Sequence, residues 1–413
     1  MKHTWAVSPM VPSRAGRRLA LGAAILLALL AVAVSSRAQS SGSIQLRGLV
    51  DIVAGDDSDY RTWNTLNTND TNFDGLRARL FVEGNRGNTS VYLQFLVSPE
   101  SYSAYRFFGG YVMQRLFDDK NLFLEAGLIP VHDGIWASTT YSNKNPLVGL
   151  PMSYYWKTSM SAFSVPVSLD QLLSMRGKGQ AYGVAYTDST GAVRGKRYAA
   201  SPILYDNCWN YGVYALGTLG RVEFAGGVTL GSASASVQGS DSNENLAVHG
   251  KIGYAFTPGL RAWLSVQRGA YFDRVVSPYL PAGKTANDYY QNLWGVSADW
   301  KIWKLWLMGE YWGNHWDTPV RSNGLDNQSY YSQLVYSFLA GWDASVRFDA
   351  MRFNKVMNSA GQDVTWDAPV DRWETGISYH VSRELIVKGV GQFTRVDNTE
   401  WDLIPAVQAS FSF

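Results

Sequence analysis

Apolar and polar residues alternate one by one along most of the chain after residue 43. The segment 342–349, for example, reads WDASVRFD, and the segment 44–52 follows a similar pattern. A period of two places apolar side chains on one face of a β-strand and polar side chains on the other. The pattern therefore predicts strands and no long amphipathic helix. Strands are expected near residues 44–54, 75–84, 89–97, 105–116, 121–129, 208–217, 221–231, 246–257, 260–271, 289–300, 303–313, 329–339, 343–354, 370–380, 384–394 and 402–413.

The connections between these strands alternate between short and long. Short turns such as 257–259 and 340–341 alternate with polar stretches such as 272–288 and 354–369. Membrane barrels built from consecutive hairpins have this arrangement, with short turns on one side of the membrane and long loops on the other. The other long connections are expected at 56–73, 232–245 and 314–328.

The predicted strands number sixteen, and an even number is the rule for bacterial barrels. Residues 130–207 then form one long insertion that is rich in Ser, Pro and Gly. Within it, segments 181–186 and 197–204 would add one more hairpin, which leaves eighteen strands as an alternative. The predicted fold class is all-β, a transmembrane antiparallel up-and-down barrel, and a soluble β-sandwich is the alternative fold.

Charged side chains gather on one alternate face of the predicted strands. A water-filled lumen requires this sorting, because the outer face of a membrane barrel must be apolar. Strands of about 10–12 residues also fit a membrane better than a soluble sandwich, whose strands average about 5–6 residues. Aromatic residues near strand ends, among them Trp209, Trp312 and Tyr331, are assigned to belts at the membrane surfaces. The predicted pore-lining residues are Arg47, Asp51, Arg77, Arg79, Glu83, Arg221, Lys251, Arg261, Glu310, Arg347, Arg372 and Lys388.

The N-terminus predicts export from the cytoplasm. Residues 1–18 contain four Lys or Arg residues, residues 19–34 are an apolar run, and small residues follow up to Ala38. This order is typical of a secretory signal peptide cleaved after Ala38, with a membrane anchor as the alternative. The predicted domains are a signal peptide of residues 1–38 and a single barrel of residues 39–413, in which 130–207 is an inserted constriction loop.

Composition and charge agree with an exported barrel. The 413 residues include 36 Lys and Arg and 34 Asp and Glu, which gives a formal net charge of +2. Five basic residues and no acidic residue lie in residues 1–38, so the exported chain carries a net charge of −3. This balance argues against a nucleic-acid partner, and an aromatic content of 14% excludes disorder. The single cysteine, Cys208, cannot form an internal disulfide.

The last predicted strand alternates up to the final residue of the sequence, which ends in Phe411, Ser412 and Phe413. This ending resembles the C-terminal signal of Gram-negative outer-membrane barrels, which the barrel-insertion machinery recognises. Phe411 and Phe413 are therefore predicted to be the assembly signal. The resemblance implies the insertion machinery and outer-membrane lipid as partners.

Several short motifs point to a narrower resemblance. Residues 125–130 read EAGLIP and lead into Gly134 and then residues 145–147 (NPL), while Tyr254 precedes a hairpin of residues 257–260 (TPGL). On these motifs the chain resembles the outer-membrane porins of the phosphate-selective porin O/P-type superfamily. The resemblance implies a 16-stranded barrel that is often trimeric, so a homotrimer is one option. It also implies a long loop folded into the lumen, for which the insertion described above is the candidate.

Phosphate selectivity does not follow from this resemblance. The phosphate channels of that superfamily use a dense arginine ladder and a lysine cluster, whereas the lumen predicted here mixes both signs of charge. Arg77 and Arg79 are the best fragment of such a ladder. The alternative is that these arginines pair with Asp51 or Glu83 and only neutralise the barrel wall.

Catalytic and metal-binding motifs are not found in the sequence. The histidines that remain after processing have no HExxH spacing, and no GxSxG motif occurs. Two acidic loops leave Ca²⁺ binding open as an alternative to solvated loops. The histidines are His132, His249, His315 and His380, and the acidic loop residues are Asp56, Asp57, Asp59 and Asp70, with Asp241 and Glu244 in the second loop.

The predicted function is a passive channel in the cell outer membrane. Small hydrophilic solutes, anions among them, would diffuse through a lumen narrowed by residues 130–207, with no enzymatic activity, cofactor or metal. The alternative function is a structural or adhesive barrel with a plugged lumen.

Overall fold

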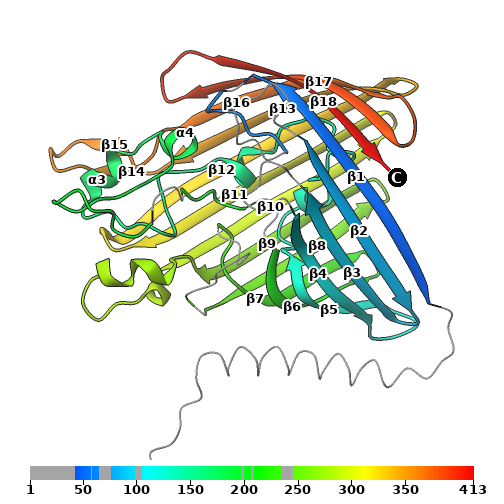
Figure 1. Cartoon of the computed structure of the whole chain (residues 1–413), viewed down its shortest axis with the longest axis horizontal. Helices are drawn as coiled ribbons and strands as arrows, with labels where there is room; N and C mark the ends of the chain where they lie inside the picture. The colour runs from blue at the N-terminus through cyan, green and yellow to red at the C-terminus, as the bar shows by residue number, and fades with distance from the viewer. Residues whose placement is uncertain are drawn as a thin grey trace, which may run out of the picture.

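The chain folds into a closed antiparallel barrel of sixteen strands, as predicted (Figure 1). The computed structural model describes residues 42–56, 58–64, 76–97, 105–196, 200–205, 209–234, 243 and 245–413. The barrel strands are β1 (Ser43–Gly55), β2 (Arg77–Arg86), β3 (Thr89–Val97), β4 (Tyr105–Arg115), β5 (Asn121–Pro130), β6 (Trp209–Leu219), β7 (Val222–Leu230), β8 (Leu246–Thr257), β9 (Leu260–Ala270), β10 (Tyr290–Ile302), β11 (Leu305–Thr318), β12 (Arg321–Leu339), β13 (Trp342–Phe353), β16 (Val370–His380), β17 (Leu385–Val396) and β18 (Asp402–Ser412).

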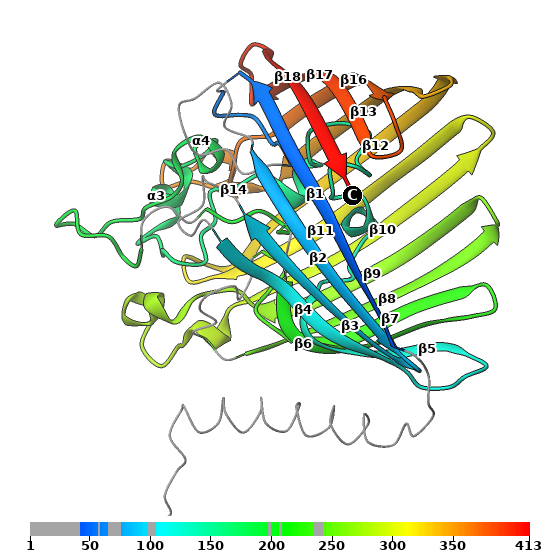
Figure 2. The same ribbon diagram turned by 45° about the vertical axis from the view of Figure 1, so that its right-hand side comes forward.

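The barrel closes where its first and last strands meet. Strand β1 pairs with β18 from Leu49–Ser412 to Gly55–Ala406, and the two strands run side by side in Figure 2. Closure leaves no unpaired sheet edge, which is what a sheet in lipid needs because the hydrocarbon offers no hydrogen-bond partners. Among the described residues, no helix is both long and apolar enough to cross a membrane.

The alternative of eighteen barrel strands is wrong. The remaining strands, β14 (Lys355–Met357) and β15 (Asp363–Thr365), form a separate two-stranded sheet. The segment 181–186 does not supply a barrel strand, because it begins inside helix α4 (Gly179–Tyr182). The predicted signal peptide lies outside the described residues, as do Cys208 and the acidic loop residues Asp57, Asp70, Asp241 and Glu244.

Short and long connections lie at opposite ends of the barrel, as the sequence predicted. We call these the short-turn end and the long-loop end. One expected long connection, 314–328, is instead mostly strand, because β11 and β12 continue to a tight turn at residues 319–320. Polar residues made this stretch look like a loop in the sequence. Inside the barrel they form hydrogen bonds with one another, and the Asn314 amide donates to Asn327 Oδ1 at 2.8 Å.

The two faces of the strands differ as the period of two requires. On β16, Trp373 and Ile377 point outward and are about half exposed, whereas Arg372 and Glu374 point inward and are fully buried. The outward face is therefore apolar and the inward face is charged. The belt assignment fails for some aromatic residues, because Trp209, Trp312, Tyr289 and Tyr331 are buried while Tyr211, Trp300, Trp303, Trp342 and Trp373 are exposed.

The long insertion after β5 folds into the barrel and over its long-loop end. It contains η1 (Trp136–Ser138), α2 (Met152–Tyr155), α3 (Leu169–Leu173) and α4, of which α2 contacts β12 and β13. Figure 1 places α3 and α4 beside β14 and β15 at the long-loop end, where η2 (Arg274–Tyr279) and η3 (Ala286–Asp288) also belong to a long connection.

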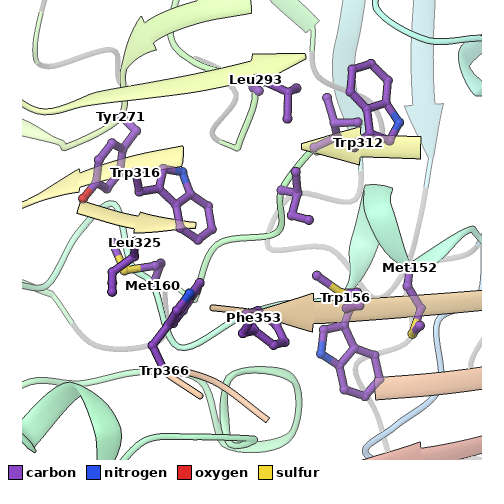
Figure 3. Packing of buried hydrophobic residues seen from close by; sticks show 14 of the residues in the cluster. Met152, Trp156, Met160, Tyr271, Leu293, Trp312, Trp316, Leu325, Phe353 and Trp366 are labelled. Carbon is purple, nitrogen blue, oxygen red and sulfur yellow. The ribbon is translucent and has the colours of Figure 1, made fainter. Parts of the chain in front are cut away.

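One side of the lumen is filled by a hydrophobic core. Met152, Trp156 and Met160 of the insertion belong to the same buried cluster as inward-facing residues of the strands (Figure 3). Those partners include Leu293 of β10, Trp312 and Trp316 of β11, Leu325 of β12 and Phe353 of β13, and Trp366 follows β15. Burial of apolar surface on this scale holds the insertion in place.

Candidate passage through the barrel

A network of buried ions fixes the insertion to β13 and β16. Arg347 bonds to Asp349 (Nε–Oδ2, 3.1 Å) and to Glu374 (Nη2–Oε2, 2.5 Å), and Arg372 completes the network. Register explains the arrangement, because Arg347 lies opposite Glu374 and Asp349 lies opposite Arg372 on neighbouring strands. Paired charges of this kind tolerate burial because each ion replaces the water it loses with a partner.

The backbone of residues 148–152 bonds directly to this network. Glu374 accepts hydrogen bonds from the N–H groups of Val148 (3.2 Å) and Gly149 (2.6 Å). Asp349 accepts from Met152 N (3.0 Å), and Arg372 Nη2 donates to Leu150 O (2.6 Å). A Cβ at Gly149 would lie only 2.1 Å from Glu374 Oε2, so glycine is what allows this approach.

A second anchor lies between β17 and β1. Lys388 Nζ is buried and donates to three backbone carbonyls of the insertion, those of Ser142, Asn145 (2.6 Å) and Leu147 (3.2 Å). Asp51 accepts from the Ser142 hydroxyl and pairs with Arg77 (3.1 Å). Residues 142–147 are therefore fixed by hydrogen bonds to charged side chains of the barrel wall.

The beginning of the insertion is held by Glu310 of β11. Its carboxylate accepts from the N–H groups of Ile135 and Trp136, and from the Tyr154 hydroxyl at 2.6 Å. Lys251 donates to Gly134 O. Three neighbouring backbone groups and α2 are thus tied to one side of the barrel.

At the long-loop end, Asp367 holds another part of the insertion. Its carboxylate accepts from the N–H groups of Ser159 (2.6 Å), Gly177 (2.7 Å) and Ala368 (2.8 Å). Burial raises the pKa of the Asp367 carboxyl, and these hydrogen bonds oppose that rise by favouring the charged form.

Most of the predicted pore-lining residues therefore face inward without facing open water. They are buried inside the barrel, which corrects the expectation of an open, hydrated wall at these positions. The buried residues are Asp51, Arg77, Arg79, Glu310, Arg347, Arg372 and Lys388.

The pair Arg77 and Arg79 does not form a ladder for anions. Arg77 pairs with Asp51, as the alternative interpretation held. The Arg79 guanidinium carbon lies 5.1 Å from the ring centre of Phe108 and 5.0 Å from that of Tyr141. Both arginines are buried and help to hold the wall and the insertion together.

A large cavity lies inside the barrel, between the insertion and strands β1–β6. Its volume is about 760 Å³. At the short-turn end it touches Arg47, Arg383 and Glu384, and toward the long-loop end it touches Tyr205 and Ala233. A cavity that touches residues from both ends is the candidate passage for solutes.

A smaller cavity of about 310 Å³ lies on the other side of the insertion. Lys251 and Arg261 line it, and Arg261 pairs with Asp299 (3.0 Å) and Glu223 (3.6 Å). His132, Ala137 and Ser138 border both cavities, so this part of the insertion separates them.

The remaining candidates lie near the short-turn end. Arg47 lines the large cavity and pairs with Glu83. Arg221 lies in the turn between β6 and β7, where it is exposed and donates to Phe256 O (3.4 Å). The structure therefore brings Arg47 and Glu83 together but places Arg221 apart from the inner wall.

Sequence reasoning missed the aromatic side of the large cavity. Phe81, Tyr92, Tyr111, Tyr141 and Trp209 line it. The first three lie at inward positions of predicted strands. The alternation of residues along these strands could therefore have identified them as facing the lumen. The sequence predicts Trp209 in the outer belt, whereas it is buried, because periodicity alone does not define the orientation of the first residue of a strand.

The histidines are paired with carboxylates. His132 lies 2.7 Å from Glu125, and His249 Nδ1 lies 2.8 Å from Asp133. His249 points inward and is buried, as expected for a wall residue. No group of three or more His, Cys, Asp or Glu residues able to hold a metal occurs among the residues placed by the structure, which include Asp56 and Asp59.

No family model and no curated protein matches the sequence. Solved structures do match its fold. An anion-selective porin from Comamonas acidovorans is 10% identical, with a TM-score of 0.52 over 90% of this chain and 100% of that one. OmpF from Salmonella typhi, in complex with daunomycin, is 13% identical, with a TM-score of 0.53 over 90% and 97%.

A loop L8 deletion mutant of OmpT, an outer membrane protein of Vibrio cholerae, is 10% identical with a TM-score of 0.50 over 91% of this chain and 100% of that chain. The chain has a porin-like barrel fold. At such identities the likeness establishes the fold alone.

Proposed function

We propose that the chain is a passive channel in the cell outer membrane, through which small hydrophilic solutes diffuse. The observation that carries this proposal is the large cavity, which touches residues from both ends of a closed barrel. The apolar outer face of the barrel is compatible with contact to membrane lipid. The N-terminal sequence has the features of a secretory signal peptide, which supports export. In this proposal the insertion 130–207 is the constriction that sets the size of the solutes.

Planar-bilayer recording tests the channel. Purified, folded protein is expected to produce stepwise ionic currents in KCl. Folded protein that inserts into the bilayer but carries no current at any voltage would overturn the proposal.

The alternative function is a structural or adhesive barrel with a plugged lumen. The hydrophobic core on one side of the lumen favours it, because buried apolar side chains of the insertion and of β10–β13 pack together there. The same recording distinguishes the two functions, since a plugged barrel inserts without conducting.

Charge in the passage leads to a prediction on ion selectivity. Lys144 lines the large cavity and is exposed there, and no ion pair of its side chain occurs among the described residues. The variant Lys144→Glu is expected to shift the reversal potential in a KCl gradient toward cation selectivity. Lys304→Glu, in the exposed turn between β10 and β11, is the matched control and is expected to leave the reversal potential unchanged. An equal shift in both variants would contradict a passage beside Lys144.

Phosphate selectivity is not part of the proposal. The phosphate-selective porin O/P-type resemblance supports a 16-stranded barrel with an inserted loop, but Arg77 is neutralised by Asp51. Anion preference therefore depends on Lys144 and Arg383, since Arg47 is paired with Glu83, and the reversal potential of the unmodified protein measures it.

The C-terminal residues support assembly in the outer membrane. Phe411 and Phe413 are exposed on the outer face, and the backbone of Phe413 exchanges two hydrogen bonds with Gly48 of β1. We propose that both aromatic side chains are read by the barrel-insertion machinery, and that the folded barrel contacts outer-membrane lipid. A homotrimer also belongs to the proposal, and migration in unboiled detergent gels measures the oligomeric state.

Removal of Phe413 is expected to lower the yield of folded barrel in cells several-fold, because the closing hydrogen bonds and the recognised ring are lost together. Heat-modifiable gel migration measures the folded fraction. Removing the ring of Phe393, which is exposed on the outer face of β17, by Phe393→Leu is the control. Unchanged yield after deletion of Phe413 would argue against an assembly role.

A further inference from the structure

The large cavity is lined by residues of two chemical kinds. One side consists of aromatic rings from the barrel wall and the insertion, namely Phe81, Tyr92, Tyr111, Tyr141 and Trp209. The insertion also supplies polar lining residues, with Asp133, Ser138, Thr140, Asn143 and Lys144.

The rings on the aromatic side are arranged as one stacked group. The planes of Tyr92 and Trp209 differ by 8° with ring centres 6.1 Å apart, and Tyr111 stacks on Tyr92 at 5.1 Å. Phe81 lies 6.3 Å from Tyr92 and meets Tyr141 edge-on at 5.4 Å. Trp209 and Phe81 are buried at the base of this group, whereas Tyr92, Tyr111 and Tyr141 are only partly buried and border the cavity.

The position of these rings is fixed by their surroundings. The hydroxyls of Tyr92 (3.2 Å) and Tyr141 (2.9 Å) both donate to Gln94 Oε1. A Cβ at Gly109 would lie 2.0 Å from the Trp209 indole, so a glycine on β4 makes room for that ring. A preorganised aromatic surface binds a ring without the entropic cost of ordering its own side chains.

Such a cavity suits a solute with a flat ring face and a polar edge. Rings stack on aromatic side chains, and hydroxyl or carboxylate groups bond to polar lining residues. A volume of about 760 Å³ is large enough for a compound of one or two rings. Acyclic solutes of the same size and charge have no flat face to offer.

We infer that the aromatic side of the large cavity is a stacking site that selects ring-bearing polar solutes as they pass. The inference rests on the proposed channel function. Two kinds of solute share the required chemistry, aromatic carboxylates and sugars in their ring form, and paired probes distinguish them.

The test is transient block of ionic current in planar bilayers. Benzoate is compared with hexanoate, and glucose with sorbitol, so each ring has an acyclic partner of similar size and charge. Ring compounds are expected to interrupt the KCl current, with residence times that fall roughly three- to tenfold in Tyr111→Leu. Tyr111→Phe is expected to keep the effect, and so is Phe107→Leu, which removes an exposed ring on the outer face of β4.

Block by benzoate alone assigns the site to aromatic carboxylates, and block by glucose alone assigns it to sugars. KCl current that neither ring compound affects more than its acyclic partner would overturn the inference and leave the channel standing. A folded protein without KCl current would overturn the channel and the inference with it. If Tyr111→Leu does not fold, Trp209→Leu provides the same comparison on a different strand.

Discussion

Replacing residues 131–208 with a short glycine-rich turn is expected to raise the single-channel conductance several-fold. The described part of this segment packs into one side of the lumen, so the proposed channel is confined to the cavity beside β1–β6. The hairpin can be closed directly, because Pro130 and Trp209 are already paired across β5 and β6. Conductance in planar bilayers is the measurement, and the increase follows from the larger water-filled cross-section.

A matched control removes a connection that does not enter the lumen. Shortening the turn at residues 358–362, between β14 and β15, is expected to leave the conductance unchanged. The shortened barrel will be less stable, since inward-facing Trp312 and Trp316 lose the apolar partners supplied by the insertion. Heat-modifiable migration verifies that it still folds. A folded barrel without the insertion that conducts no better than the intact protein would contradict a constriction by residues 131–208.

Breaking the buried ion network is expected to produce the largest loss of stability. The variant Glu374→Ala removes the acceptor of the Val148 and Gly149 N–H groups and leaves the Arg347 charge with one partner fewer. Removing one member of a buried pair costs about 3–5 kcal/mol in the free energy of unfolding, because the other charge stays buried without compensation. Urea unfolding in lipid vesicles measures the loss.

Two further variants make this prediction specific. Glu374→Gln keeps the acceptor oxygen but not the charge, so an intermediate loss is expected. Glu400→Ala, on an exposed residue, is expected to change the free energy of unfolding by less than about 0.5 kcal/mol. The loosened insertion should also make the current of Glu374→Ala noisier, since residues 148–152 lose contacts to the wall. A loss no greater than that of Glu400→Ala would show that the network does not hold the insertion.

The sequence by itself determined the all-β class, most of the strands and their two faces, while sixteen strands were separated from eighteen only by the structure. The prediction of strands and faces was possible because the period of two is a local property, so the residues of each strand are enough to define its inward and outward positions. The same rule assigns Arg372 and Glu374 to the inner face, where both are fully buried. The rule failed at 314–328, because the polar composition of this stretch is typical of a loop. In the structure, inward-facing residues such as Asn314 and Asn327 hydrogen-bond to each other.

Only the tertiary structure decided what the inward-facing charges do. Glu374 accepts a hydrogen bond from Gly149, which is 225 positions away in the sequence, and Lys388 donates to Asn145, which is 243 positions away. A local sequence pattern cannot predict such contacts. A charged residue facing a lumen has the same sequence signature whether it meets water or a folded segment. The barrel could therefore be predicted from periodicity, whereas the filled side of the lumen and the aromatic cavity could not, because they depend on where residues 131–208 pack.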